Sequence, residues 1–285
     1  MNNVLMIDIG VNFSNSRLLK RTDQIIERAI QAQVKGLILT GTDPTNSMEM
    51  ISLCTTLSAS HPHISLWSTA GVHPHDAEAA LKGNFKYGSW LEHIKMVHQL
   101  GSNVIAVGEC GLDYERNYSS PSSQRIVFDQ QLQLAVALQR PLFLHQRGAK
   151  DDFIAMLKTY APHLPKRGDK LAAVVHCFTD DKACLEALID LGCYIGITGW
   201  IADERRADKL REAVTILPLD RVLLETDAPY LLPRTLRPKP KTGLNEPAYL
   251  PHIAEQLSLF TEYTCAEIKQ NALHNTLTLF GIDIE

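Results

Sequence analysis

The sequence lacks paired cysteines, membrane-length apolar runs and an excess of positive charge. Its six cysteines are scattered and none forms a Cys-x-x-Cys pair. This argues against a zinc ribbon or a redox pair and favours reduced thiols in the cytoplasm. No apolar run approaches the ~20 residues that cross a bilayer, and the first residues do not have the pattern of a secretory leader. We therefore expect a cytoplasmic protein without a membrane partner.

Charge and glycine patterning exclude two further classes. The formal net charge of −4 provides no bulk attraction to nucleic acid, so an anionic ligand would need a local basic patch. No Gly-x-Gly-x-x-Gly follows the first apolar run, which disfavours a dinucleotide-binding fold. The chain has 285 residues, of which 45% are hydrophobic and 21% charged, the profile of a folded globular protein. We expect one domain over residues 1–285.

What the sequence does contain is eight short apolar runs separated by helix-like segments. Most runs are continuously apolar, as expected of parallel strands covered on both faces. Between them, residues 128–138 have helical spacing, and Pro121 marks a helix start. Eight such repeats favour a closed (β/α)8 TIM barrel over an open sheet. The runs are Val4–Asp8, Gly36–Thr40, Leu66–Val72, Val104–Gly108, Pro141–Leu144, Ala172–Val175, Tyr194–Thr198 and Val222–Leu224.

Polar residues follow these runs, at the strand ends where a barrel carries its active site. Any one of them could be a hydrogen-bonded structural residue or a helix cap. Together, however, four supply imidazoles and carboxylates, the donors that a divalent metal needs. These four are Glu109, His145, His176 and Asp227. We therefore predict a metal site, with Asp227 as a metal ligand or as the group that takes a proton from water.

Three further polar residues adjoin this predicted site. Glu225 stands two residues before Asp227, so both point to one side of a regular strand. It is either a polar contact in the barrel interior or an ion-pair partner. His73 and His75 are separated by a proline, and we expect them to contact the metal ligands or the substrate rather than the metal itself.

A basic loop follows the last apolar run, in "APYLLPRTLRPKPKTG". It contains Arg234, Arg237, Lys239 and Lys241 and no acidic residue. Next to a metal site such a loop can hold phosphates, although a solvated surface is an equal alternative. Two enzyme classes remain: hydrolysis of a phosphodiester, and hydrolysis of a cyclic amide or lactone. A metal-binding barrel without chemistry would leave the loop unexplained. The basic loop favours a substrate that carries phosphate, and so the hydrolysis of a phosphodiester.

Side chains of other predicted loops could extend this binding surface. Arg147 stands two residues after His145 and could hold a further phosphate. Arg205 and Arg206 follow the seventh run. Aromatic residues of neighbouring loops could stack on nucleobases; they are Tyr114, Tyr230 and Trp200.

Five segments together resemble the TatD family of metal-dependent nucleases. They are "GVHPHDA", "GECGLDYERN", "VVHCFT", "YIGITGWIADERR" and "ETDAPYLLPR", and the resemblance runs from Asp8 to Phe280. It implies a barrel of the metal-dependent hydrolase superfamily, with a divalent metal held by Glu109, His145 and His176. It also implies 3′-5′ exonuclease action on single-stranded DNA and RNA in repair of oxidative DNA damage. We expect Mg²⁺, with Mn²⁺ or Zn²⁺ as alternatives, and a monomer.

The first strand departs from the pattern of this family. The resemblance implies a His-x-His pair at the end of the first strand, as in most members. This chain has Gly10 and Asn12 at the matching positions. Two ligands of a tightly held second metal are therefore absent. We expect Asn12 to offer an oxygen to a weakly bound second cation or to substrate, and Asp8 to brace the barrel by a hydrogen bond.

Overall fold

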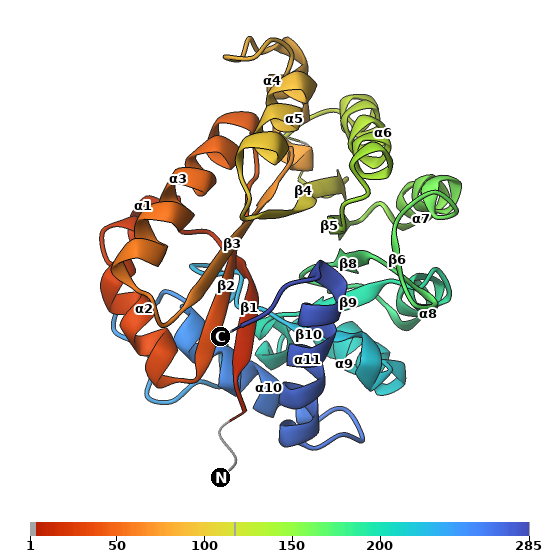
Figure 1. Cartoon of the computed structure of the whole chain (residues 1–285). Helices are drawn as coiled ribbons and strands as arrows, with labels where there is room; N and C mark the ends of the chain where they lie inside the picture. The colour runs from red at the N-terminus through yellow and green to blue at the C-terminus, as the bar shows by residue number, and fades with distance from the viewer. Residues whose placement is uncertain (1–3, 117, 285) are drawn as a thin grey trace.

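Eight parallel strands form one sheet in the computed structural model, which describes residues 4–116 and 118–284. The strands follow one another in chain order around the sheet, as Figure 1 shows. They are β1 (Met6–Val11), β2 (Val34–Leu39), β3 (Ser65–Ala70), β4 (Val104–Asp113), β5 (Leu142–Arg147), β8 (Ala173–Val175), β9 (Tyr194–Ile197) and β10 (Val222–Leu224). Two further strands, β6 (Lys166–Arg167) and β7 (Lys170–Leu171), lie outside this sheet and pair with each other in a small antiparallel hairpin.

The sheet closes into a barrel where the end of β10 meets β1. The backbone N–H of Asp227 donates to the carbonyl of Gly10 at 2.9 Å, and that of Asn12 donates to the carbonyl of Ala228 at 2.8 Å. The predicted (β/α)8 barrel is therefore confirmed. The closing hydrogen bonds also fix Asp227 and Asn12 side by side at the carboxyl ends of the strands.

Two strands are longer than the apolar runs that predicted them. β1 continues three residues beyond Asp8, and β4 continues through Glu109 to Asp113. The prediction that Asp8 and Glu109 end their strands is wrong. The physical reason is that buried apolar residues continue at every second position beyond each carboxylate, with glycine between them, as Ile9 and Val11 do in β1 and Cys110 and Leu112 do in β4.

Helices surround the strands on the outside of the barrel (Figure 1). The predicted helix around Pro121 is α6, which begins at Pro121 with Ser120 as its N-cap. The α-helices are α1 (Ser16–Leu19), α2 (Thr22–Gln31), α3 (Pro44–Ser60), α4 (Ala77–Lys82), α5 (Trp90–Leu100), α6 (Pro121–Leu138), α7 (Lys150–Tyr160), α8 (Lys182–Asp190), α9 (Asp208–Ala213), α10 (Leu250–Ser258) and α11 (Cys265–Phe280). Short 3₁₀ turns are η1 (Pro74–Asp76), η2 (Gly199–Ala202), η3 (Val214–Ile216), η4 (Leu219–Arg221) and η5 (Pro247–Tyr249). Within the described ranges, no helix has the length and apolar character to span a membrane.

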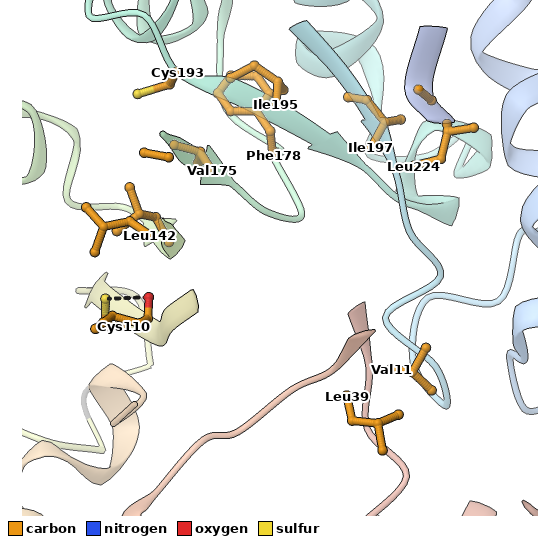
Figure 2. Close-up of a cluster of buried hydrophobic side chains, with 14 of the residues drawn as sticks. Val11, Leu39, Cys110, Leu142, Val175, Phe178, Cys193, Ile195, Ile197 and Leu224 are labelled. Atoms are coloured by element: carbon orange, nitrogen blue, oxygen red, sulfur yellow. Dashed lines mark hydrogen bonds between the residues drawn. The ribbon is translucent and has the colours of Figure 1, made fainter. Parts of the chain in front are cut away.

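Two apolar layers position the mouth of the barrel. The larger fills the space between strands and helices. The smaller lies inside the barrel, where Phe143 and Tyr194 pack with Leu279 and Phe280 of α11. The barrel is thus plugged by apolar side chains, which leaves its polar groups to gather at the carboxyl ends of the strands. Figure 2 shows members of the larger layer: Val11, Leu39, Cys110, Leu142, Val175, Phe178, Cys193, Ile195, Ile197 and Leu224.

Candidate metal centre

Three imidazoles converge on one carboxylate oxygen at the mouth of the barrel. Oε1 of Glu109 lies 2.7 Å from Nε2 of His176, 2.9 Å from Nδ1 of His145 and 3.3 Å from Nε2 of His73. Glu109 and His145 come from β4 and β5, His176 follows β8, and His73 follows β3. The structure therefore brings together side chains from four consecutive strands of the barrel.

A second carboxylate stands behind each of two imidazoles. Nδ1 of His176 lies 3.2 Å from Oε2 of Glu225, and Nε2 of His145 lies 3.5 Å from Oδ2 of Asp113. Each ring thus has one nitrogen toward Glu109 and the other toward a supporting carboxylate. A carboxylate behind a histidine fixes the ring's tautomer and orientation, the arrangement that metal-binding histidines commonly have.

Asp113 is held in place by more than one contact. Its Oδ1 accepts hydrogen bonds from the backbone N–H groups of Glu115 and Arg116, and its Oδ2 lies 2.7 Å from Nε2 of His75. Burial alone would raise the pKa of Asp113, but the nearby His145 imidazole and the hydrogen bond with His75 hold that pKa below its usual range. His75 therefore contacts the metal centre through Asp113.

Sequence reasoning missed Asp113, although a signal for it was present. Glu109 and Asp113 are four residues apart in "GECGLD". In a strand, residues at even spacing share one face. The apolar run predicts a strand that ends at Gly108, so Glu109 and Asp113 are not expected to lie in one strand and to share a face.

The ionisation of the cluster follows from burial and from mutual charge. Burial would raise the pKa of Glu109, but the facing His176 and His73 hold it well below its usual range. Burial lowers the pKa of His73 to about 4. For His176, the charges of Glu109 and Glu225 outweigh burial and raise the pKa well above its usual value. Glu109 is therefore anionic and His73 neutral near pH ~7, as donors to a cation must be.

Asp227 stands beside this cluster and is held by Asn12. The Asn12 amide Nδ2 donates to Oδ1 of Asp227 at 2.9 Å and to the Ala228 carbonyl at 3.2 Å. Burial, together with the charges of Glu109 and Glu225, raises the pKa of Asp227 to about 7. A carboxylate with such a pKa can exchange a proton near neutrality.

Glu225 occupies the space beside Gly10. A Cβ atom built on Gly10 would lie 2.5 Å from Oε2 of Glu225, and one built on Gly196 would clash with Oε1. The buried Glu225 carboxylate also accepts a hydrogen bond from the backbone N–H of Cys177. Of the two alternatives for Glu225, the structure thus gives an interior contact that also pairs with His176. The place where a histidine at position 10 would project is filled by this carboxylate.

The residues present fit a divalent cation. His73, Glu109 and His145 each offer one ligand atom, and these atoms lie within 4.8 Å of one another. Nε2 of His145 is buried without a hydrogen-bond partner among the described residues. Imidazole nitrogens with carboxylate oxygens are a donor set that Mg²⁺, Mn²⁺ or Zn²⁺ can use. The geometry places His73 in this group, whereas the sequence suggested a more remote position.

Asp8 lies below the metal centre and supports β10. Its carboxylate accepts hydrogen bonds from the backbone N–H of Thr226 at 2.8 Å and from the Thr226 hydroxyl at 2.5 Å. The predicted bracing role of Asp8 is therefore confirmed. The amide nitrogen of Asn12 is directed to Asp227, and an approach of its oxygen to a second cation or to substrate stays a prediction.

The predicted basic groups divide into paired and exposed ones. Nε of Arg147 lies 2.7 Å from Oε2 of Glu115, and Nε of Arg234 lies 3.3 Å from Oε1 of Glu204. Arg205 and Arg206 both pair with Asp203. By contrast, Arg237 donates only to backbone carbonyls of its own loop among the described residues, and it is exposed together with Lys239 and Lys241. The exposed members are thus the ones most available to a phosphate.

Known proteins resemble this chain over nearly its whole length. The family model described as TatD related DNase matches residues 7–281. A Salmonella typhimurium protein named 3′-5′ ssDNA/RNA exonuclease TatD is 45% identical over 255 residues, which make up 90% of this chain and 91% of that protein. A protein of the same name from Edwardsiella piscicida is 44% identical, over 97% of this chain and 100% of that protein.

Solved structures show the same fold. A crystal structure of YjjV, a TatD homolog from Escherichia coli, superposes with a TM-score of 0.81 and 28% identity, covering 99% of this chain and 100% of that one. An uncharacterized amidohydrolase from Saccharomyces cerevisiae superposes with a TM-score of 0.85 over 97% of this chain and 100% of that one. At 23% identity, the second structure supports the fold alone.

Proposed function

The chain belongs to the family of TatD-related DNases, and from this premise we propose that it is a metal-dependent 3′-5′ exonuclease of single-stranded DNA and RNA. The observation that carries the proposal is the convergence of three imidazoles on Glu109 beside Asp227. The 45% identity to a protein named 3′-5′ ssDNA/RNA exonuclease TatD supports the substrate and the polarity.

The cation would be held by the convergent cluster. We propose that Glu109, His145, His176 and Asp227 would hold it, together with His73, whose ligand atom lies within 4.8 Å of those of Glu109 and His145. We propose Mg²⁺ as the activating cation, with Mn²⁺ and Zn²⁺ as alternatives, since imidazole suits the last two. When bound, a divalent cation supplies Lewis-acid polarisation of the scissile phosphate and neutralises its charge.

The side chains around the cluster have separate tasks in hydrolysis. The oxygen of water forms a bond to phosphorus, the bond from phosphorus to the leaving oxygen breaks, and that oxygen gains a proton from solvent water. Asp227 accepts the proton of the water at Oδ2, because Asn12 already occupies Oδ1. Glu225 and Asp113 hold the rings of His176 and His145 in orientation.

Hydrolysis of a cyclic amide or lactone is the alternative reaction for such a barrel. A structural neighbour described as N-isopropylammelide isopropylaminohydrolase from Burkholderia multivorans is 13% identical, a similarity that concerns the fold alone. The exposed Arg237 and Lys239 favour phosphate. We further propose a cytoplasmic monomer that acts in repair of oxidatively damaged DNA, and these three points stay predictions.

One experiment tests the proposed function directly. Single-stranded oligonucleotides labelled at the 3′ or the 5′ end are digested over time by purified protein, first with a chelator and then with Mg²⁺, Mn²⁺ or Zn²⁺ restored. We expect immediate release of the 3′ label, a descending ladder from the 5′-labelled strand, and no digestion with chelator. Digestion in chelator would refute the metal requirement, and early release of the 5′ label would refute the polarity.

A further inference from the structure

Two tyrosine rings stand exposed at the mouth of the barrel, outside the metal centre. Tyr230 follows Asp227 by three residues and is 46% exposed, while Tyr118 lies in the loop after β4 and is 69% exposed. β4 and β10 are the fourth and the eighth of the eight strands. The segments that follow these two strands therefore lie on opposite sides of the mouth.

Tyr230 is held in a defined position despite its exposure. Its hydroxyl accepts a hydrogen bond from Nδ2 of Asn15 at 3.1 Å, and its backbone N–H donates to the carbonyl of Asp227 at 2.9 Å. The guanidinium of Arg17 lies 5.4 Å from the ring centroid. Asn15 is the N-cap of α1 and Arg17 lies in α1, the first helix after β1, and β1 neighbours β10. The ring is thus ordered before any ligand arrives, which lowers the cost of stacking on it.

Positive charge gathers on the Tyr230 side of the mouth. The segments 15–21 and 230–241 contain no aspartate or glutamate. Their exposed basic residues are Arg17, Lys20, Arg21, Arg234, Arg237, Lys239 and Lys241. Apart from the pairing of Arg234 with acidic residues before it, this surface is suited to several consecutive phosphates.

The Tyr118 side of the mouth differs from the Tyr230 side in its charge and in its position relative to the metal centre. The segments 74–78 and 114–120 contain three acidic residues and one arginine, namely Asp76, Glu78, Glu115 and Arg116. The ring of Tyr118 stands edge-on to the ring of His75, with 4.8 Å between their centroids, and His75 is bonded to Asp113. This side adjoins the metal centre directly and offers no run of cations for further phosphates.

We propose that the substrate strand crosses the mouth from Tyr230 to Tyr118. The retained part of the strand lies along segments 15–21 and 230–241, with one nucleobase stacked on Tyr230, and the terminal nucleotide lies against Tyr118. The proposal rests on the proposed exonuclease function and adds to it a direction of the strand over the site. Stacking accepts every base, so the two rings bind the strand without selecting sequence.

The test compares substrates of two lengths in a set of variants. The substrates are a dinucleotide and a single strand of about 12 nucleotides, a length within the range that one such groove binds. Tyr230→Ala should raise the KM of the longer strand about 10-fold more than that of the dinucleotide, the loss expected for one stacked base. Tyr230→Phe keeps the ring and should stay close to the parental KM. Tyr118→Ala should raise both KM values to a similar extent, because both substrates have a terminal base.

A chemically matched pair serves as the control. The ammonium of Lys86 lies 5.1 Å from the ring centroid of Tyr87 in the loop between α4 and α5, outside the segments along which we propose that the strand lies. Lys86→Ala and Tyr87→Ala should leave both KM values unchanged. The same increase in these variants, or an equal effect of Tyr230→Ala on both lengths, would overturn the proposal.

A binding measurement separates this proposal from the proposed function. Fluorescence anisotropy of a labelled strand of about 12 nucleotides, recorded with chelator, reports affinity without hydrolysis. Tyr230→Ala should weaken binding about 10-fold, and Tyr230→Phe should not. If no variant alters affinity, the path over Tyr230 is refuted even for an active nuclease. If affinity depends on Tyr230 but no strand is hydrolysed after the cation is restored, the proposed function fails and the path stands.

Discussion

The amide nitrogen of Asn12 lies 2.9 Å from a carboxylate oxygen of Asp227, although the two residues are 215 positions apart in the chain. The contact exists because the barrel closes at this point, where β1 and the end of β10 exchange backbone hydrogen bonds. Asn12 thereby supports the residue to which we assign proton transfer. At the position where the family resemblance implies a histidine, this chain has an amide that donates to the carboxylate of our proposed proton acceptor.

Asn12→Ala should lower kcat by about 10- to 100-fold, the range seen when a supporting hydrogen bond is lost behind a site residue. KM should change little, because Asn12 lies behind Asp227 rather than along the proposed strand. Steady-state digestion of a 3′-labelled strand measures both constants. A parental kcat in this variant would show that the hydrogen bond to Asp227 has no part in the reaction.

Removal of either supporting carboxylate should weaken the binding of the cation. Asp113→Asn and Glu225→Gln keep the size of the side chain but remove the charge behind His145 and His176, and we expect affinity for Mn²⁺ to fall by about 10- to 100-fold. Isothermal titration with Mn²⁺ provides the measurement. Asp129→Asn is the control, since Asp129 of the outer helix α6 accepts a hydrogen bond from the hydroxyl of Tyr160 at the end of α7. An equal loss in the control would point to a general effect on folding.

His145→Ala and Asp227→Asn should each remove most nuclease activity, the first by loss of a proposed ligand and the second by loss of the proton acceptor. His73→Ala should also reduce activity, because His73 lies with Glu109 and His145 in one potential metal group. Circular dichroism confirms that each variant is folded. A folded variant that digests DNA at the parental rate contradicts the role assigned to that residue.

Salt dependence should distinguish exposed from paired cations. For single strands, each lost phosphate contact reduces the slope of log K against log salt by about 0.7. Arg237→Ala with Lys239→Ala should therefore flatten the slope clearly. Arg234→Ala should change it less, because Glu204 already lies 3.3 Å from that guanidinium. Equal slopes in the parental protein and the double variant would leave this loop a solvated surface.

Asp8 should make the stability of the fold depend on pH. Burial raises the pKa of Asp8 from 3.8 to about 8, against the opposing hydrogen bonds from Thr226. A raised pKa means that the folded chain binds this proton more tightly, so the stabilisation is complete below the unfolded pKa and is lost as the pH rises through the folded pKa. Asp8→Asn has no such proton to lose.

The test is urea unfolding of both proteins across this interval. The unfolding free energy of the parental protein should fall relative to that of Asp8→Asn by about 1 kcal/mol per pH unit between the two pKa values of Asp8. Comparison with the variant cancels the titration of the metal centre, which both proteins share. A constant difference would mean that Asp8 is ionised throughout.

The barrel and the convergence of Glu109, His145 and His176 could be predicted because their signals are local. Each of Glu109, His145 and His176 follows a buried apolar run directly, and a closed barrel gathers the ends of its strands. Asp113 escaped because its signal depended on how far β4 continues, and that length is set by packing on both faces of the strand.

Pairing between loops could not be predicted from local patterns. Arg147 stood out as a free cation, but its partner Glu115 is 32 positions away and comes from the neighbouring strand's loop. Arg17 and Tyr230 meet only because β1 and β10 are the first and the last strand of a closed sheet. Such pairs are determined by the order of the strands in the closed sheet, so the pattern of one short segment does not predict them.

The close approach of Gly10 and Glu225 links the first strand to the segment that follows β10. Any side chain placed at residue 10 meets a carboxylate that is buried and bonded to His176. That carboxylate would have to shift to admit the side chain, and the shift would disturb its contact with His176. The size of residue 10 is therefore tied to the orientation of an imidazole that follows another strand.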